Sequence, residues 1–479
     1  MNLSSRNHQK TKIVATLGPA SSSKEVLEKL IQAGADVFRL NFSHGSHEVH
    51  QKTINTIIKI NEEHNINIGI LCDLQGPKLR VGEIENNELP LEKDDILTFV
   101  NEKCVGNKEK IYMSYESFAA DVNVGEKVMI DDGKIHLEVV ESDRKSQVKL
   151  KVLFGGTLSS NKGVNLPDTK ISLPSLTKKD LADLEFILTQ PANWIALSFV
   201  RSSEDVIQLK NKITDAGHFA KVISKIEKPE AISDIKGIIK ATDAIMIARG
   251  DLGVEVPMEK LPPIQKDIIK RCIKMGRPVI VATQMMDSMI TNPSPTRAEI
   301  TDVANAVLDG ADAVMLSGET SVGKFPIEVV TAMSKIIAEA EKHYELHTKR
   351  PKANQNSSTY YSDTICFGAA KMAEDIKAKA ILGITVSGHT AFKVASYRPN
   401  SLIYIFSSVK PMLATMNLIW GVQTFFYDKF SSTDETITDL TEILKERNLL
   451  DKGDVVVNTA SMPLAKRFRT NTLKITIVD

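Results

Sequence analysis

Apolar and polar positions divide most of the chain into two alternating kinds of segment. Short apolar runs rich in β-branched residues predict strands at residues 11–18, 36–42, 68–74, 194–199, 221–226, 244–249, 278–283 and 313–318. Between most of them, apolar residues recur with a helical period, and several of these stretches open with Ser, Pro or an acid and close with Gly. Eight strand–helix units predict an α/β fold built on a (β/α)8 TIM barrel. An open doubly wound sheet alternates in the same way, and only the count of eight favours the barrel.

The connection between the third and fourth strands breaks this alternation. It carries period-two segments at 94–100, 126–141 and 146–156, with turn residues between them. The pattern predicts an all-β domain inserted over residues 82–169, with the barrel formed by 1–81 and 170–345. An insertion at the top of a barrel is well placed to act as a lid, although an insertion without a catalytic role would have the same pattern.

A second change of pattern follows residue 343, where the composition becomes that of a polar linker. Beyond it, apolar runs near 380–386, 402–406, 422–427, 454–460 and 473–478 alternate with helical stretches. Residues 346–479 are therefore expected to form a separate C-terminal α/β domain with a mostly parallel sheet.

Composition narrows the functional classes. Lys and Arg together number 60, as do Asp and Glu, so a net charge of zero argues against non-specific binding to nucleic acid. The four cysteines are scattered without a CxxC pair, which suits a reducing compartment. The first residues lack the apolar core of a signal peptide, and no apolar run approaches membrane length. We expect a cytoplasmic protein without nucleic-acid or membrane partners.

Polar side chains follow seven of the eight predicted barrel strands. Catalytic groups of such barrels lie at the carboxyl ends of the strands, so these side chains predict one catalytic rim. The residues are Arg39, Asn41, Ser43 and His44; Asp73, Lys78 and Arg80; Ser198 and Arg201; Lys225, Glu227 and Lys228; Arg249, Gly250 and Asp251; Thr283 and Gln284; and Ser317 and Glu319.

The chemistry of these side chains points to phosphoryl transfer. The rim offers carboxylates suited to Mg²⁺ or Mn²⁺ (Glu227, Asp251), cations for phosphate and carboxylate oxygens (Arg39, Arg80, Lys225) and exchangeable protons (Thr283, Ser317, Glu319). No Ser-His-Asp or Cys-His set is apparent. A metal site and several cations without an activated nucleophilic side chain are typical of phosphoryl transfer, in which positioning and charge neutralisation supply most of the catalysis.

Two other motifs are weaker. Residues 318–324 match GxxxxGK, but Phe325 stands where a P-loop needs Ser or Thr. Residues 44–50 carry three histidines at three-residue spacing without HExxH, and such histidines are more often solvated than bound to zinc.

Segments at these positions resemble the pyruvate kinase family, in order and over essentially the whole chain. They include TKIVATLGPAS, RLNFSHG, LQGPKLR, SKIEKPE, IARGDLGVE, VATQMMDSM and the run from PTRAEITDVANAV to LSGET. The resemblance implies transfer of the phosphoryl group of phosphoenolpyruvate to ADP, giving pyruvate and ATP, in an enzyme that uses Mg²⁺ or Mn²⁺. It also implies a homotetramer by analogy.

The resemblance implies roles for individual residues. Glu227 and Asp251 would hold the divalent metal; Lys225 and Arg39 would contact the transferring phosphoryl group; Gly250, Asp251 and Thr283 would take the substrate carboxylate; Thr283, Ser317 and Glu319 would order the water that protonates the enolate; Asn41, His44, Arg80 and Lys162 would contact the nucleotide; and Arg297 would be structural, near a subunit interface.

One segment departs from the family pattern. Asn41, Ser43, Asp73 and the residue at 74 belong to the family's monovalent-cation pocket, and many members read DTKGPEIRT where this chain reads DLQGPKLRV. Leu74 replaces a Thr, and Lys78 replaces a Glu whose charge K⁺ offsets. The tethered ammonium of Lys78 can take that place, so the resemblance to the K⁺-independent subgroup predicts activity without K⁺. A solvated loop lysine is the alternative.

The C-terminal domain resembles the effector domain of the family. Ser387, Gly388, His389 and Thr390 lie at a strand–helix junction where main-chain N–H groups could receive a phosphate, and Lys466, Arg467 and Arg469 are available for an anion. A loop and a basic patch without any ligand explain these residues equally well.

Two other functions stay open from the sequence. One is a metal-dependent barrel lyase or aldolase acting on pyruvate-type substrates, and the other is a catalytically silent phosphoenolpyruvate-binding regulator.

Overall fold

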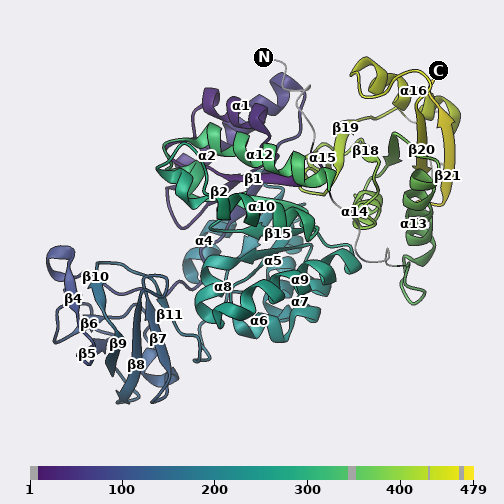
Figure 1. Ribbon diagram of the computed structural model, residues 1–479. Coiled ribbons are helices and arrows are strands. Elements are labelled where there is room, and N and C mark those ends of the chain that lie inside the picture. Colours follow the sequence, from purple (N-terminus) through teal and green to yellow (C-terminus); the bar gives the residue numbers. More distant parts are fainter. Residues whose placement is uncertain (1–8, 344–351, 430–431, 463–468) are drawn as a thin grey trace.

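The predicted barrel forms in full. The computed structural model describes residues 9–343, 352–429, 432–462 and 469–479. Its eight parallel strands close in the order β1-β16-β15-β14-β13-β12-β3-β2, which confirms the TIM barrel and excludes the open sheet (Figure 1). The strands are β1 (Lys12–Thr16), β2 (Val37–Asn41), β3 (Gly69–Asp73), β12 (Trp194–Leu197), β13 (Lys221–Ile226), β14 (Ala244–Ala248), β15 (Val279–Ala282) and β16 (Ala313–Leu316).

Helices surround the barrel and pack their apolar faces on it. They are α1 (Lys24–Ala33), α2 (His47–His64), α4 (Lys178–Ile187), α5 (Ser203–Asp215), α6 (Pro229–Ser233), α7 (Ile235–Ala241), α8 (Arg249–Glu255), α9 (Leu261–Met275), α10 (Arg297–Leu308), α11 (Gly318–Ser321) and α12 (Pro326–Lys342). Capping chemistry fixes several starts: Thr177 and Asp180 form a capping box, as do Thr296 and Glu299. The helical pattern at 229–241 splits into α6 and α7 because Asp234 leaves helical geometry and accepts a hydrogen bond from the Ser203 N–H.

The insertion, called the lid below, is a β-rich domain with one short helix and a hydrophobic core of its own. Strand alternation drives it: β8 buries every second residue over most of its length. Six strands pair in the order β11-β7-β8-β9-β5-β6, and β10 pairs with β4. The elements are β4 (Leu89–Leu91), β5 (Ile96–Val100), β6 (Ile111–Tyr112), α3 (Phe118–Asp121), β7 (Lys127–Ile130), β8 (Ile135–Ser142), β9 (Gln147–Phe154), β10 (Gly156–Leu158) and β11 (Val164–Asn165). The lid core extends from Leu79 to Ile171.

The C-terminal domain has a five-stranded sheet in the order β19-β18-β17-β20-β21, in which only β20 and β21 pair antiparallel. This confirms the mostly parallel sheet. The elements are α13 (Tyr360–Asp375), β17 (Ala380–Ile384), α14 (His389–Ser396), β18 (Leu402–Ser407), α15 (Lys410–Met416), β19 (Val422–Phe426), α16 (Thr433–Glu446), β20 (Val455–Ala460) and β21 (Thr472–Ile477).

The C-terminal domain docks on the amino-terminal end of the barrel. Leu418 packs among the side chains that fill this end of the barrel interior. Lys12 Nζ donates to the Val422 carbonyl at 2.8 Å, and Trp194 Nε1 donates to the Thr415 carbonyl at 3.1 Å. The carboxyl ends of the strands stay available for a site, and Figure 1 shows the barrel lying between the lid and the C-terminal domain.

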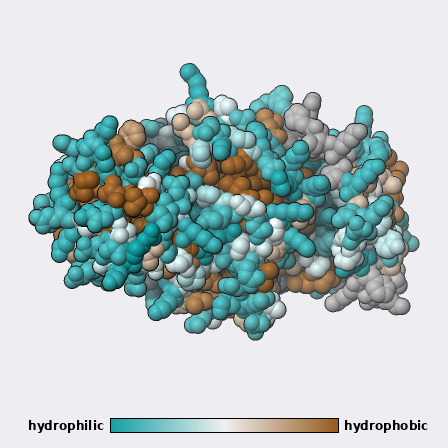
Figure 2. Space-filling view, turned by 90° about the horizontal axis from the view of Figure 1, so that it is seen from below, coloured by the Kyte–Doolittle hydropathy of each residue, from teal (hydrophilic) through white to brown (hydrophobic). Residues whose placement is uncertain are grey.

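One face of the molecule is mostly polar but carries apolar patches (Figure 2). Figure 2 shows one face that is mostly hydrophilic, with apolar side chains gathered in patches over the lid and over the barrel. Within the described residues, no helix combines the length and the apolar content needed to cross a bilayer.

Candidate active site

A buried carboxylate organises the rim where β2, β3 and β13 end. Asp73 is 1% exposed, and its Oδ2 accepts from Arg39 Nε at 2.7 Å. Its Oδ1 lies 3.4 Å from Lys225 Nζ. Burial alone would raise the pKa of Asp73, but the charges of Lys225 and Arg39 outweigh it and lower the pKa. Thr16 completes the arrangement by accepting from Arg39 Nη1 at 2.9 Å.

Lys225 bridges three strand ends. Its Nζ donates to Ser198 Oγ at 2.7 Å and lies 3.0 Å from Glu227 Oε1. Burial would lower the pKa of Lys225, but the charges of Asp73 and Glu227 raise it, so the side chain stays an ammonium ion. Glu227 Oε2 accepts from the Phe199 N–H at 2.6 Å, which fixes the carboxylate against the end of β12.

Glu227 and Asp251 are two carboxylates at neighbouring strand ends, of the kind that could hold Mg²⁺ or Mn²⁺. Glu227 directly follows β13, and Asp251 lies in the first turn of α8, which directly follows the neighbouring strand β14. Burial raises the pKa of Glu227, Lys225 counteracts this, and the negative charge of Asp251 raises the pKa further. A divalent cation would relieve that repulsion, and it prefers the hard oxygen ligands found here.

The end of β15 brings Thr283 to the same rim. Thr283 and Gln284 have φ values of 67° and 54°, a left-handed backbone that non-glycine residues rarely adopt. Thr283 Oγ1 accepts from the Gly250 N–H at 2.7 Å. The guanidinium of Arg249 is already engaged, because it donates to the Thr283 carbonyl and pairs with Asp302.

Glu319 is a buried carboxyl behind Ser317. It is 2% exposed and accepts from the Ser317 N–H at 2.6 Å and the Met286 N–H at 3.2 Å. Burial raises the pKa of Glu319, which outweighs these main-chain donors. The residue therefore holds the Ser317 backbone in place and favours its protonated form more than an exposed Glu does.

Cations gather between the rim and the lid. Burial lowers the pKa of His44, and the charges of Arg80, Lys78 and Arg39 lower it further, so these groups share one positive field. Asn41 Oδ1 accepts from the Ser43 N–H at 3.1 Å, and Leu74 is buried next to Asp73. Arg80 Nη1 donates to the Asn161 carbonyl of the lid at 2.8 Å.

Two further predicted residues have partners of other kinds, although the main chain of Lys162 accepts from the Val81 N–H beside Arg80. Lys162 Nζ pairs with Asp131 within the lid at 2.8 Å. Arg297 begins α10 with an exposed side chain.

Comparison with known proteins decides the family. The model of the pyruvate kinase barrel domain matches residues 8–330, and that of the pyruvate kinase alpha/beta domain matches residues 363–476. The chain belongs to the pyruvate kinase family. "Pyruvate kinase 2" of Synechocystis sp. is 43% identical over 473 residues, covering 98% of this chain and 79% of that protein. The pyruvate kinase of Geobacillus stearothermophilus is 41% identical, covering 98% and 81%.

The structural comparison agrees. The crystal structure of a pyruvate kinase from Cryptosporidium parvum superposes with a TM-score of 0.91 at 35% identity, covering 98% of this chain and 96% of that one. The chain is therefore a phosphotransferase of the pyruvate kinase family, and the rim that holds Lys225 is its candidate active site.

The predicted effector loop of this pyruvate kinase family member lies against the barrel. Gly388 adopts a φ of 82°, and His389 Nε2 lies 3.0 Å from Asp363 Oδ1. Thr390 Oγ1 hydrogen-bonds Thr470 Oγ1 at 2.7 Å, whereas Ser387 is exposed. The loop lines a pocket that it shares with barrel residues, among them Lys221 and Arg277.

Of the basic patch named with this loop, only Arg469 belongs to the described part of the chain. Lys466 and Arg467 lie outside it. Arg469 Nη1 donates to the Ser358 carbonyl.

The two weaker motifs form no site of their own. Gly318 begins the short helix α11, and the Gly323 N–H donates to the Gly318 carbonyl, so the segment is a helix and turn instead of a phosphate loop. The histidines have protein partners instead: His47 Nε2 lies 2.7 Å from Asp183 Oδ1, and His50 stacks on Phe42 with its Nε2 2.9 Å from the His44 carbonyl. His50 is buried, so the expectation of solvated histidines is wrong at that position.

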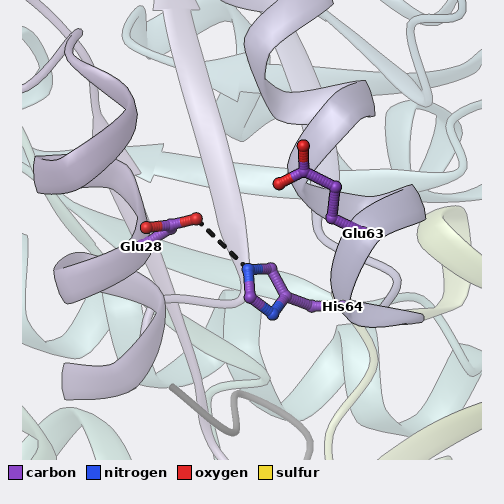
Figure 3. Close-up of side chains that lie close together, drawn as sticks. All are labelled: Glu28, Glu63 and His64. Carbon is purple, nitrogen blue, oxygen red and sulfur yellow. Dashed lines mark hydrogen bonds and ion pairs between the residues drawn. The ribbon is translucent and has the colours of Figure 1, made fainter.

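A carboxylate–histidine cluster lies on the flank of the barrel. Among the described residues, three metal-type ligands come within reach of one another at Glu28, Glu63 and His64, on α1 and α2 (Figure 3). His64 Nε2 lies 3.2 Å from Glu28 Oε1. Lys24 pairs with both carboxylates, so the cluster is an ion-pair network between two helices.

Proposed function

We propose that this enzyme transfers the phosphoryl group of phosphoenolpyruvate to ADP, giving pyruvate and ATP. The observation that carries the proposal is the buried network of Arg39, Asp73, Lys225 and Glu227 at one mouth of the barrel. It places two fixed cations and a carboxylate ligand within one small volume. That combination suits a reaction in which charge neutralisation supplies most of the catalysis.

The residues have separate tasks in the transfer. Glu227 and Asp251 would hold Mg²⁺ or Mn²⁺, which supplies charge neutralisation when bound. Lys225 and Arg39 orient the phosphoryl group while its bond to the enol oxygen breaks and a bond to the terminal phosphate of ADP forms. Asp73 pairs with both cations and holds them in position, and its charge raises the pKa of Lys225.

The remaining enolate must take up a proton. Thr283 and the Gly250 N–H face one another at 2.7 Å, where they can receive the substrate carboxylate. Glu319 holds the Ser317 backbone in place. Because burial favours its protonated form, Glu319 can also supply the proton that ordered water passes to the enolate.

The nucleotide is assigned to the cleft between rim and lid. The positive field at His44 and Arg80 suits its phosphates, and Asn41 lies beside it. Lys162 would join after exchanging its ion pair with Asp131 for a phosphate, which a small lid movement allows.

Lys78 is proposed to replace K⁺. Its side chain is half-buried in the cleft that Asp251 also lines, and it lies against Gly163 of the lid. It forms no ion pair of 4.0 Å or less with any described residue. The ammonium group of Lys78 supplies a positive charge at this place. Family members that carry Glu at this position obtain that charge from a bound K⁺ ion.

One assay tests both the proposed reaction and the proposed replacement of K⁺ by Lys78. ATP formation from ADP and phosphoenolpyruvate, with Mg²⁺ and tetramethylammonium as the sole monovalent cation, should proceed at nearly the rate seen with K⁺. Two charges about 4 Å apart interact by roughly 4 kcal/mol at an effective dielectric near 20, so Lys78→Glu should create a K⁺ stimulation of up to about a thousandfold. Absence of ATP formation refutes the reaction, whereas strong K⁺ stimulation of the wild type refutes only the role of Lys78.

Three further assignments rest on the family. We propose a homotetramer, a cytoplasmic location and an anionic effector at Ser387–Thr390. The pocket beside this loop supports the last of these, because Lys221, Arg277 and Lys393 line it. Titration of the enzyme with sugar phosphates and nucleoside monophosphates, followed by its activity, tests the effector.

A further inference from the structure

A second buried ion pair lies beside the proposed metal ligands. Lys228 Nζ donates to Glu255 Oε1 at 2.7 Å, and the two residues are 5% and 4% exposed. The same Glu255 oxygen accepts from Asn165 Nδ2 at 2.9 Å. The other oxygen, Oε2, is buried without a hydrogen-bond partner among the described residues. A buried pair of this kind needs a structural or functional reason, since two charges lose much hydration for it.

Both members of the pair are tied to proposed metal ligands. Lys228 directly follows Glu227 at the end of β13, and Glu255 lies one helical turn beyond Asp251 on α8. The ion pair therefore clamps the end of β13 to the end of α8. Because α8 has only seven residues, a shift of Glu255 moves Asp251 with it.

The third member of the network belongs to the lid. Asn165 lies in β11, the lid strand that pairs with β7. The lid turn at Gly133 also approaches the same helix, because a methyl group added at Gly133 would sit 3.4 Å from Val254 Cγ1. The lid thus rests on the carboxyl-terminal end of α8 through Val254 and Glu255, while the opposite end of α8 carries Asp251.

We propose that Asn165, Lys228 and Glu255 are positioning residues that couple docking of the lid to the geometry of the metal site. The inference rests on the proposed role of Glu227 and Asp251 as metal ligands. When the lid docks, the Asn165 amide fixes Glu255, the ion pair with Lys228 sets the spacing between β13 and α8, and the two carboxylates are held ready for the cation. When the lid moves away, Glu255 loses this donor and α8 gains freedom. Metal binding must in turn favour the docked lid, because such coupling is reciprocal.

Asn165→Leu removes the lid's hydrogen bond while keeping the side-chain size and leaving both charges paired. Thr169→Val is the matched control, because Thr169 is equally buried in the lid and donates to a lid carboxylate, Glu126 Oε2, at 2.6 Å. Outer partners of metal ligands typically change metal affinity by tenfold or more, so Asn165→Leu should raise the Mn²⁺ dissociation constant about tenfold, and Thr169→Val should not. Val254→Ala trims the side chain that faces the lid turn at Gly133 and should weaken Mn²⁺ binding in the same direction.

The primary readout is Mn²⁺ binding to the full-length enzyme, measured by electron paramagnetic resonance without substrate. The second is hydrogen exchange of the β11 and α8 amides. Mn²⁺ should slow exchange in wild type and in Thr169→Val, and this protection should be lost in Asn165→Leu. In activity assays the metal activation constant should rise about tenfold, with kcat at saturating metal nearly unchanged.

The outcomes separate the inference from the function on which it rests. Equal Mn²⁺ affinity and equal metal-dependent protection in Asn165→Leu and Thr169→Val overturn the coupling. A loss of kcat without any change in metal affinity also overturns it, because that result marks a purely structural role. If instead Asp251→Asn binds Mn²⁺ as tightly as wild type, the proposed metal site itself is wrong.

Discussion

Replacement of Arg398 by Ala should undock the C-terminal domain from the barrel. Arg398 is 3% exposed, its Nη1 and Nη2 donate to the two oxygens of Asp312 at 3.1 and 2.9 Å, and Nη2 also donates to the Gly310 carbonyl. Its guanidinium lies 4.9 Å from the centre of the Trp420 ring. The side chain is thus a two-pronged bridge from the C-terminal domain to the amino end of β16.

The cost follows from what the substitution leaves behind. Asp312 keeps the Val279 N–H as a donor but stays buried without its counter-ion. Removing one partner of a buried ion pair costs about 3–5 kcal/mol. Arg398→Lys keeps the charge but not the two-pronged geometry and should cost less. Arg271→Ala is the control, because its pair with Asp267 is exposed and should contribute under about 1 kcal/mol.

Intrinsic fluorescence is a direct assay for this interface. The chain has two tryptophans, and both lie at it: Trp194 donates to the Thr415 carbonyl, and Trp420 stacks beneath Arg398. Urea unfolding followed by tryptophan emission should show an early transition in Arg398→Ala that is absent from Arg271→Ala. If the two variants unfold at the same urea concentration, the Arg398–Asp312 bridge does not hold the domains together.

Three other predictions concern single groups. In Asp363→Asn, the loss of stability relative to wild type should be full above about pH 5 and shrink as the pH falls below 3.8, because His389 and Lys393 outweigh burial and lower the pKa of Asp363; urea midpoints across this range measure it, and a constant difference contradicts it. In Glu319→Gln, stability relative to wild type should grow as the pH rises above about 4.5, since burial raises the folded pKa of Glu319 and its ionisation then weakens the wild type; unfolding at pH 4 and pH 8 decides this. In Ser198→Ala, Lys225 loses a hydrogen-bond acceptor at 2.7 Å, so kcat should fall about tenfold with little change in the KM for ADP; steady-state kinetics would contradict the role of Ser198 if only the KM changed.

The barrel could be predicted because the spacing of apolar residues within each strand and each helix reveals the type of element. The eight apolar runs are buried on both faces, as at Ile13–Ala15, and their number alone separated a closed barrel from an open sheet. The short lid strands β4, β6 and β11 gave no such signal, because two or three residues carry no measurable alternation. The break at Asp234 depends on a hydrogen bond from Ser203, which local periodicity does not register.

The rim could be predicted for a topological reason. Parallel strands place their carboxyl ends together, so Arg39, Asp73, Lys225 and Glu227 had to converge once the strands were known. The contacts between them could not be predicted, since they depend on which rotamers meet. Thr16, which accepts a hydrogen bond from Arg39, is the last residue of β1, but it fell inside the predicted strand at 11–18 and looked like any buried threonine.

Contacts between domains could not be predicted from local patterns in the sequence. Asn165 and Glu255 are 90 positions apart, and Arg398 and Asp312 are 86 apart, so neither pair belongs to one local pattern. A buried Glu on a helix and an Asn in a short strand are ordinary by themselves. Only their approach in space gives them a role.

The most direct measurement of the central claim is the rate of ATP formation from ADP and phosphoenolpyruvate in Lys225→Met, with Lys210→Met as control. Lys210 pairs with Asp243 on the flank of the barrel at 2.9 Å, so its loss should leave the rate nearly unchanged. Lys225 lies at the centre of the rim, and losing its charge should lower kcat by about a thousandfold or more. Equal rates in the two variants would contradict the placement of phosphoryl transfer at this end of the barrel.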